Sequence, residues 1–225
     1  MSRDQILGKV RAALKDGAPV AERKAGVAAR LARPIHHPLP ERVRKSPQDL
    51  SKLFNVMLKA CLADVVEVES KDAIPTAVAG YLRQHNLPQR VTVGADAYLA
   101  DLPWGQEPAL ARKTGRAHGD DQVAVSHATA GVAETGTIVM ASGADNPVTL
   151  NFLPETHIVV VEENDIVGPY EDAFAKVTAR FGKGQMPRTV NMISGPSRSA
   201  DIGGRLVIGA HGPRRLCVVI VKARA

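Results

Sequence analysis

The amino-acid sequence has few of the residues on which several common functions depend. Only 4% of its 225 residues are aromatic, which disfavours the stacking platforms that bind single-stranded nucleic acid. Its two cysteines, Cys61 and Cys217, are too few to supply an iron–sulfur or structural zinc site, and their apolar neighbours indicate buried thiols. No apolar run reaches the ~20 residues of a membrane span, and the first residues do not resemble a secretory signal. We therefore expect a soluble, cytoplasmic protein.

Several strong motifs are missing as well. The sequence has no phosphate-binding P-loop, no HExxH zinc motif and no GxSxG nucleophile elbow. Residues 182–187 begin like a dinucleotide-binding GxGxxG loop, but they end in proline and follow an expected helix. His127 and His157 stand alone, without the spacing of metal ligands, so we expect no metal site. The sequence leaves the cofactor unknown.

The positive charge of the chain is confined to its first part. The formal net charge of +6 invites a nucleic-acid function. However, residues 1–60 hold 13 Lys and Arg against 5 Asp and Glu, whereas the remainder holds 16 against 18. We expect this basic segment to dock onto an acidic protein partner, with no specific nucleic-acid binding.

We predict an N-terminal arm over residues 1–46 and an α/β domain over residues 47–225. In the arm, residues 2–5 form a capping box, and the apolar residues behind it fall on one helical face. Residues 17–46 are basic and interrupted by proline and glycine, which indicates an extended connector. Ser46 and Pro47 are typical of the start of the next helix.

The rest of the sequence alternates apolar strands with helices. Strands are expected at 65–68, 90–94, 123–126, 137–141, 158–161, 189–193 and 216–221, and helices after residue 70 and over 169–181. Continuous apolar strands predict a mostly parallel sheet buried on both faces and flanked by helices. Residues 127–157 have strands without a helix between them, which indicates an inserted antiparallel element.

Four glycine-rich or polar segments are candidates for a site, which we expect beyond the carboxyl ends of the strands. In the first, residues 131–137, Glu134 lies in a glycine turn and is a candidate base or nucleophile. Its neighbours add hydroxyl groups and backbone N–H groups: Thr135, Gly136 and Thr137. The alternative is a solvated glutamate in a β-turn.

The second segment, residues 194–201, has the composition of an anion-binding loop. Arg198 offers a planar fork for carboxylate or phosphate, and a short helix starting near Ser199 would add free N–H groups. The remaining candidates in it are Gly195, Ser197 and Asp201.

The third segment, 209–213, places His211 beside Gly212, where a histidine is accessible for acid–base work. The fourth, 153–157, ends in His157. Each segment is also compatible with an ordinary polar turn.

Together these segments resemble the LUD-domain family of lactate-utilisation protein C and its relatives. The resemblance covers roughly residues 120–221 and rests on residues 134–137, 153–157, 194–202 and 209–213. It implies an α/β fold shared with ribose-5-phosphate isomerase, glucosamine-6-phosphate deaminase and CoA transferases.

The resemblance also implies a role in oxidising L-lactate to pyruvate in a cytoplasmic complex whose two other subunits carry iron–sulfur clusters. Within it, Arg198 would bind a small carboxylate or phosphate ligand, and Glu134 and His211 would be the catalytic pair. Two other functions stay open. One is that of a non-catalytic docking or regulatory subunit. The other is that of a stand-alone enzyme acting on a sugar phosphate or acyl-CoA.

Overall fold

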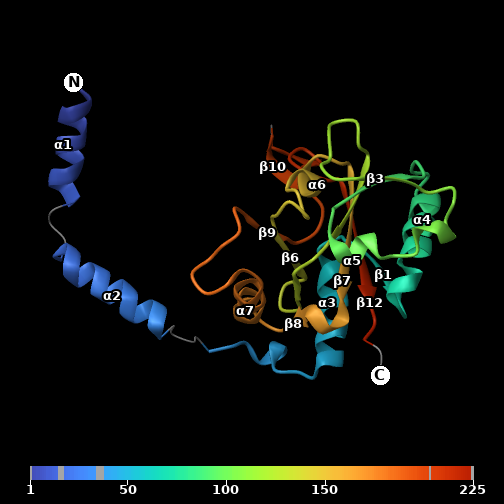
Figure 1. Ribbon diagram of the computed structural model, residues 1–225, viewed down its shortest axis with the longest axis horizontal. Coiled ribbons are helices and arrows are strands. Elements are labelled where there is room, and N and C mark those ends of the chain that lie inside the picture. The colour runs from blue at the N-terminus through green and yellow to red at the C-terminus, as the bar shows by residue number, and fades with distance from the viewer. Residues whose placement is uncertain (1, 15–17, 34–37, 203, 224–225) are drawn as a thin grey trace. The chain divides into compact units, whose positions relative to one another are not determined.

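The computed structural model describes residues 2–14, 18–33, 38–202 and 204–223, without the side chains of residues 201 and 202 (Figure 1). The chain forms two compact units, residues 1–39 and residues 40–225.

The first unit contains two helices. In α1 (Arg3–Ala13) the predicted capping box is present, with the Ser2 hydroxyl accepting from the Gln5 N–H. The prediction of an extended connector is wrong at α2 (Val20–Ala32), because alanine, lysine and arginine, all strong helix formers, dominate this stretch. Residues 34–37 of that connector lie outside the described part of the chain. No described helix has the length and apolar character needed to cross a membrane.

A parallel sheet of six strands forms the centre of the second unit. Its order across the sheet is β1 (Asp64–Val68), β12 (Arg215–Val221), β7 (Thr156–Glu162), β4 (Val123–His127), β2 (Arg90–Val93) and β3 (Ala111–Thr114). The predicted α/β class with a mostly parallel sheet is therefore confirmed. The exposed edge strand β3, with the sequence Ala-Arg-Lys-Thr, has no apolar pattern and escaped prediction.

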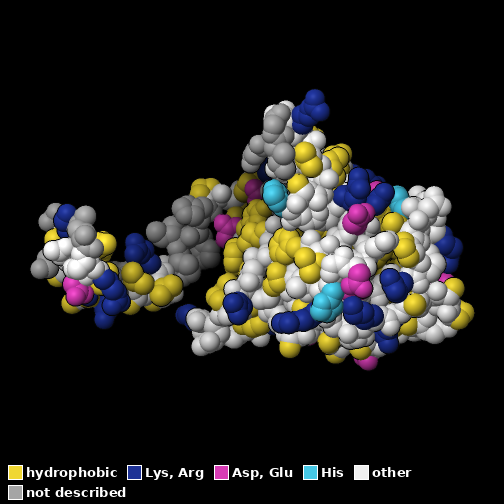
Figure 2. Space-filling model, turned by 90° about the horizontal axis from the view of Figure 1, so that it is seen from above, with side chains coloured by type: hydrophobic (Ala, Val, Ile, Leu, Met, Phe, Trp, Pro, Cys, Tyr) yellow, Lys and Arg dark blue, Asp and Glu magenta, His cyan; other side chains and the backbone are white. Residues whose placement is uncertain are grey.

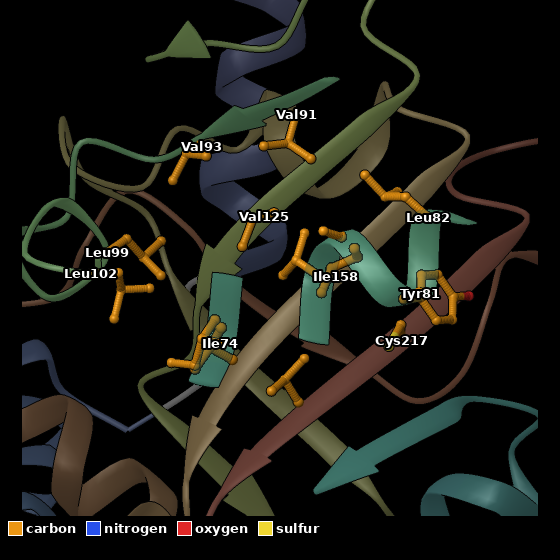
Figure 3. Close-up of a cluster of buried hydrophobic side chains, with 14 of the residues drawn as sticks. Ile74, Tyr81, Leu82, Val91, Val93, Leu99, Leu102, Val125, Ile158 and Cys217 are labelled. Carbon is orange, nitrogen blue, oxygen red and sulfur yellow. The ribbon is translucent and has the colours of Figure 1, made fainter. Parts of the chain in front are cut away.

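One face of this sheet is covered by α4 (Ile74–Gln84) and α5 (Ala97–Ala100), with the 3₁₀ turns η3 (Lys71–Ala73) and η4 (Trp104–Gln106) beside them. Figure 3 shows the resulting core, in which Ile74 and Leu82 of α4 pack near Ile158 of β7 and Cys217 of β12. The next residue along β7, Val159, is buried in a different cluster on the opposite face. Both faces are thus buried, as the continuous apolar strands predicted.

The opposite face is covered by α3 (Pro47–Ala60) and by a second sheet. The order of that sheet is β8 (Ile166–Val167), β5 (Ala130–Val132), β6 (Thr137–Ala141) and β9 (Val190–Ile193). The β5–β6 pair is the antiparallel element predicted within residues 127–157. Helix α7 (Tyr170–Phe181) packs on this second sheet through Ala173 and Val177.

Short elements complete the fold. They are η2 (Glu41–Val43), α6 (Thr149–Phe152), η5 (Glu163–Asp165) and an antiparallel hairpin of β10 (Arg198–Ile202) and β11 (Arg205–Ile208). The short helix expected near Ser199 does not form, because the backbone from Arg198 onward pairs with β11 instead. Figure 1 shows the hairpin and α6 at one end of the unit and the C-terminus at the other.

Three glycines let the C-terminal half of α3 approach the chain closely. A Cβ on Gly136 (φ +65°) would lie 2.6 Å from the Met57 carbonyl carbon, and one on Gly195 (φ +81°) would lie 2.1 Å from the Cys61 oxygen. A Cβ on Gly131 would lie 2.7 Å from the Phe54 ring. Two of the glycines predicted for the site therefore have a packing function against this helix.

We predict that Gly136→Ala destabilises the second unit through both dihedral strain and overpacking. Gly184→Ala is the matched control, because Gly184 has φ +77° but open space around it. We expect Gly184→Ala to cost about 1–2 kcal/mol for the left-handed conformation, and Gly136→Ala to cost a further ~1–3 kcal/mol for the clash. Urea unfolding of both variants measures the difference. Equal losses in the two variants would contradict the close helix contact.

Candidate functional site

A cleft of about 260 Å³ opens beside the β10–β11 hairpin. Its walls come from α6, from β7, from the loop between β9 and β10, and from the loop that precedes β12. The polar residues and glycines among those that line it are Asn151, His157, Ser194, Gly195, Ser197, Arg198, His211 and Gly212. The second and third candidate segments, 194–201 and 209–213, are thus brought together in one place.

The cleft lies at the amino ends of the central strands. His157 is the second residue of β7 and Leu216 is the second residue of β12, and both line the cleft. The expectation that the candidate segments gather beyond the carboxyl ends is therefore wrong for this cleft. The physical reason is the connectivity, because residues 153–157 and 209–213 run into β7 and β12 rather than out of them.

Ser197 holds the two loops of the cleft together. Its backbone N–H donates to the Pro213 oxygen at 2.8 Å, and its carbonyl accepts from the Gly209 N–H at 2.9 Å. Its hydroxyl accepts from the His211 N–H at 3.3 Å. Since Arg198 is the next residue, this pairing places the exposed Arg198 and His211 side chains at the same opening.

The other candidates of the second segment have different positions. Gly195 lines the cleft as well as contacting α3. Ser199 is half-buried in β10 and is not among the residues that line the cleft. Asp201 belongs to the same strand, but its side chain lies outside the described part of the structure.

Glu134 lies outside the cleft. Its carboxylate is 18% exposed and forms an ion pair of 3.5 Å with Arg42, which belongs to η2. It is not among the lining residues, whereas His211 is. The catalytic pairing of Glu134 with His211 stays a prediction that this arrangement does not favour.

A network of hydroxyl groups connects the Glu134 turn to the cleft. The Thr137 hydroxyl lies 2.7 Å from that of Thr135, 2.8 Å from that of Tyr170 and 2.6 Å from that of Ser194. Ser194 lines the cleft, and Thr135 and Tyr170 are themselves 2.8 Å apart. Because each hydroxyl both donates and accepts, such a network orients its members cooperatively. Tyr170 had no part in the sequence-based site, and Ser194 entered it only as the first residue of the second segment.

His157 is a fully buried titratable group that lines the cleft. Its Nε2 lies 3.0 Å from the Ser126 hydroxyl, and its Nδ1 has no hydrogen-bond partner within the described residues. Burial lowers the pKa of His157 to about 3, so the ring is neutral near pH 7. In the sequence, a polar residue inside the apolar strand that follows residue 155 was the signal that could have ranked His157 above the other candidate residues.

A second polar cluster lies at the carboxyl ends of the strands, where the sequence analysis proposed no residue. His127, at the end of β4, contacts Asp96 with 3.3 Å between Nδ1 and Oδ1, and stacks on Tyr98 at 4.3 Å between ring centroids. The Tyr98 hydroxyl donates to Glu162, the last residue of β7. Burial alone would raise the pKa of Asp96, but the hydrogen bonds from His127 and from the Leu99 N–H, together with the nearby charges of His127 and Arg180, outweigh burial and lower this pKa. Polar residues that end neighbouring apolar strands were the available signal.

Within the described ranges, no three His, Cys, Asp or Glu side chains gather in a way that would hold a metal ion. The chemistry of the cleft therefore rests on one guanidinium, on hydroxyl groups and on two imidazoles. Exposed hydrophobic side chains surround it, among them Phe152 and Met192. Figure 2 looks onto the end of the unit that carries α6 and the hairpin and shows hydrophobic side chains gathered on that face.

The parallel sheet, the second, mixed sheet and the hairpin define an α/β protein of a kind already seen in a crystal structure. A DUF162 family protein from Deinococcus radiodurans superposes with a TM-score of 0.60 and 26% sequence identity, covering 79% of this chain and 99% of that one. Residues 52–221 match the LUD domain, and the chain belongs to the LUD domain family.

Curated relatives carry the name lactate utilization protein C. The protein of Geobacillus kaustophilus (strain HTA426) is 30% identical over 193 residues, covering 76% of this chain and 79% of its own. That of Geobacillus thermodenitrificans (strain NG80-2) is 30% identical over 195 residues, covering 80% and 81%. That of Geobacillus sp. (strain WCH70) is 39% identical over a shorter stretch of 94 residues. The family resemblance seen in the sequence motifs is therefore confirmed.

We predict that His157 makes the folded state sensitive to acid. Below a pH of about 6.5 the unfolded chain binds a proton at this residue, and the folded chain, with the pKa near 3, does not. Stability from this one group therefore falls by about 1.4 kcal/mol for each pH unit below its unfolded pKa. Urea unfolding at pH 7 and pH 5 measures the slope.

His157→Gln should flatten that pH dependence, whatever its effect on stability at pH 7. His118→Gln is the control, because His118 is exposed and its hydrogen bonds with Asp121 are made by its backbone N–H and carbonyl, not by its ring. Equal slopes for the native chain and His157→Gln would show that His157 is not held neutral by burial.

Proposed function

We propose that this chain is a subunit of a cytoplasmic system that oxidises L-lactate to pyruvate, and that the cleft beside the β10–β11 hairpin holds the carboxylate of a small acid. The observation that carries the proposal is the meeting of Arg198, Ser197 and two histidines in that cleft. The name shared by the curated relatives supports lactate utilisation as the setting.

The size of the cleft favours a small acid. Pockets for drug-sized ligands measure roughly 300–1,000 Å³, and the cleft has about 260 Å³. A three-carbon hydroxy acid presents one carboxylate, one hydroxyl and one methyl group. The cleft offers a cation, several hydrogen-bonding groups and the apolar side chains of Phe152 and Ile193.

Arg198 and Ser197 are the groups that bind the carboxylate in this proposal. The guanidinium fork of Arg198 matches the two oxygens of a carboxylate. The Ser197 hydroxyl accepts the His211 N–H, which leaves its own proton free to donate. His157, neutral and with an unpartnered Nδ1, suits the hydroxyl of the acid better than a charged group would.

Oxidation of lactate to pyruvate releases two electrons and two protons. In the proposal His211 accepts the hydroxyl proton at the cleft opening, the C2–H bond breaks and its proton passes to water, and the iron–sulfur partner subunits accept the two electrons. Glu134 remains the second candidate for proton transfer, at the far end of the hydroxyl network that begins at Ser194.

A non-catalytic docking role is the second candidate function, and the first unit favours it. The apolar side chains of α1 and α2 are exposed: Ile6, Val10, Leu14, Val20, Val27 and Leu31. Basic residues accompany them, as in the groove that Arg23 and Lys24 line with Val27. An acidic partner with an apolar groove would fit these helices.

We predict that Arg198→Gln weakens L-lactate and pyruvate binding at least about tenfold, because a charge-assisted bidentate bond is lost. Arg205→Gln, on the partner strand of the same hairpin but outside the cleft, should change binding little. Calorimetric titration of both acids measures this. The rate of lactate oxidation by the chain reconstituted with its iron–sulfur partners should fall in Arg198→Gln and change little in Arg205→Gln. Unchanged binding and turnover in Arg198→Gln would refute the carboxylate site.

Deleting residues 1–39 tests the docking function. We expect the remaining unit, residues 40–225, to keep its L-lactate affinity and to lose co-purification with the iron–sulfur subunits. The substitution of Arg23 and Lys24 by glutamate in the full chain is the matched variant, since it reverses charge without shortening the chain. Intact complexes with both variants would rule out docking through α1 and α2.

A further inference from the structure

A second cleft in the second unit, of about 830 Å³, shares no lining residue with the lactate cleft proposed above. It is lined by the loop after β3, the loop after β6, the start of α6 and the residues before β9. We propose that this second cleft binds a phosphate-bearing ligand of nucleotide size. The proposal does not depend on the assignment of the first cleft.

Two arginines supply the charge of this cleft. Arg116 and Arg188 both line it and are both exposed. None of the described residues that line it is acidic, and neither arginine forms an ion pair within the described ranges. Asp145, from the loop that borders the cleft, is engaged by Arg180 at 2.5 Å. Two uncompensated guanidinium groups in one concavity attract an anion of more than one charge.

The two segments that carry these arginines are anchored to the cleft walls. On one side, Gly115 (φ +120°) donates its N–H to the Val93 oxygen at 2.8 Å, and Ala117 donates to the Thr149 hydroxyl at 3.2 Å. Arg116, which lies between them, is therefore held against α6. The position of this arginine does not depend on a long free loop.

On the other side, Ser142 and Thr189 exchange two hydrogen bonds. The Ser142 N–H donates to the Thr189 oxygen, and the Thr189 N–H donates to the Ser142 hydroxyl, both at 2.9 Å. This pair fixes the backbone beside Arg188. A site whose cations are placed in advance loses less entropy when a ligand binds.

The size and location of the cleft select the class of ligand. A volume of about 830 Å³ is near the upper end of the range for pockets that enclose whole small molecules, and it exceeds the needs of a single phosphate ion. Arg116 is the second residue beyond the carboxyl end of β3, and this is the end of parallel strands at which phosphate-bearing ligands commonly bind. Two guanidinium forks match the oxygens of two linked phosphates.

Calorimetric titration of the full chain with ADP, pyrophosphate and adenosine tests the proposal. We expect ADP and pyrophosphate to bind and adenosine not to bind. Arg116→Gln and Arg188→Gln should each weaken ADP binding at least about tenfold, because each removes one charge-assisted pair. Arg90→Gln, an exposed arginine at the amino end of β2, should leave it unchanged.

Three results would overturn the proposal. They are no ADP binding at about 1 mM, equal binding of ADP and adenosine, or an equal loss of affinity in Arg90→Gln and the two cleft variants. Arg198→Gln separates this site from the first one. It should keep ADP affinity even where it abolishes lactate binding, and loss of ADP affinity in Arg198→Gln would place the nucleotide in the other cleft. Circular dichroism melting curves confirm that each variant is folded.

Discussion

Close backbone contact between the end of α3 and two glycine turns is the constraint on which the candidate cleft depends. Gly136 and Gly195 both have positive φ, and both lie where a Cβ would collide with α3 backbone. The same two turns are joined to each other by the Thr137–Ser194 hydrogen bond. Helix α3, the turn between β5 and β6, and the loop before β10 are therefore held together as one body. The positions of Ser197 and Arg198, two and three residues beyond Gly195, follow from this body together with the hydrogen bonds of Ser197 to residues 209–213.

Most of the second unit was predictable from the sequence, because its strands are buried on both faces. Residues 158–161 and 216–221 are apolar without interruption, and such runs are typical of fully buried strands. Elements that bury little were missed. The edge strand β3 is fully exposed, and α2 buries no side chain, so neither has the apolar pattern that sequence analysis detects. The β10–β11 hairpin is set by pairing between its own two strands, which local composition does not reveal.

The candidate site was predictable in part. The loops around Arg198 and His211 do meet, as a single site built from both residues requires. The edge of the sheet at which they meet was not predictable, because it depends on the order of the strands and on the hairpin inserted before β12. Glu134 is a local turn residue whose partner, Arg42, is 92 positions away. His157 lay in a candidate segment, but its contact with Ser126 and the Asp96–His127 pair become visible only when strands are placed side by side.

The place of β12 in the sheet has a consequence for how the chain acquires its structure. β12 is last in the sequence, yet it lies between β1 and β7, with Val218 aligned to Val65 on one side and to Val159 on the other. Until residue 221 has been synthesised, β1 lacks its neighbour in the sheet, and the apolar edge of β7 is open. Such a topology delays the closing contacts of folding until β12 has been synthesised, and pairings between residues so distant in sequence form slowly. Until then the nascent chain exposes the apolar surfaces that β12 will cover, and a chaperone that shields them would prevent wrong association.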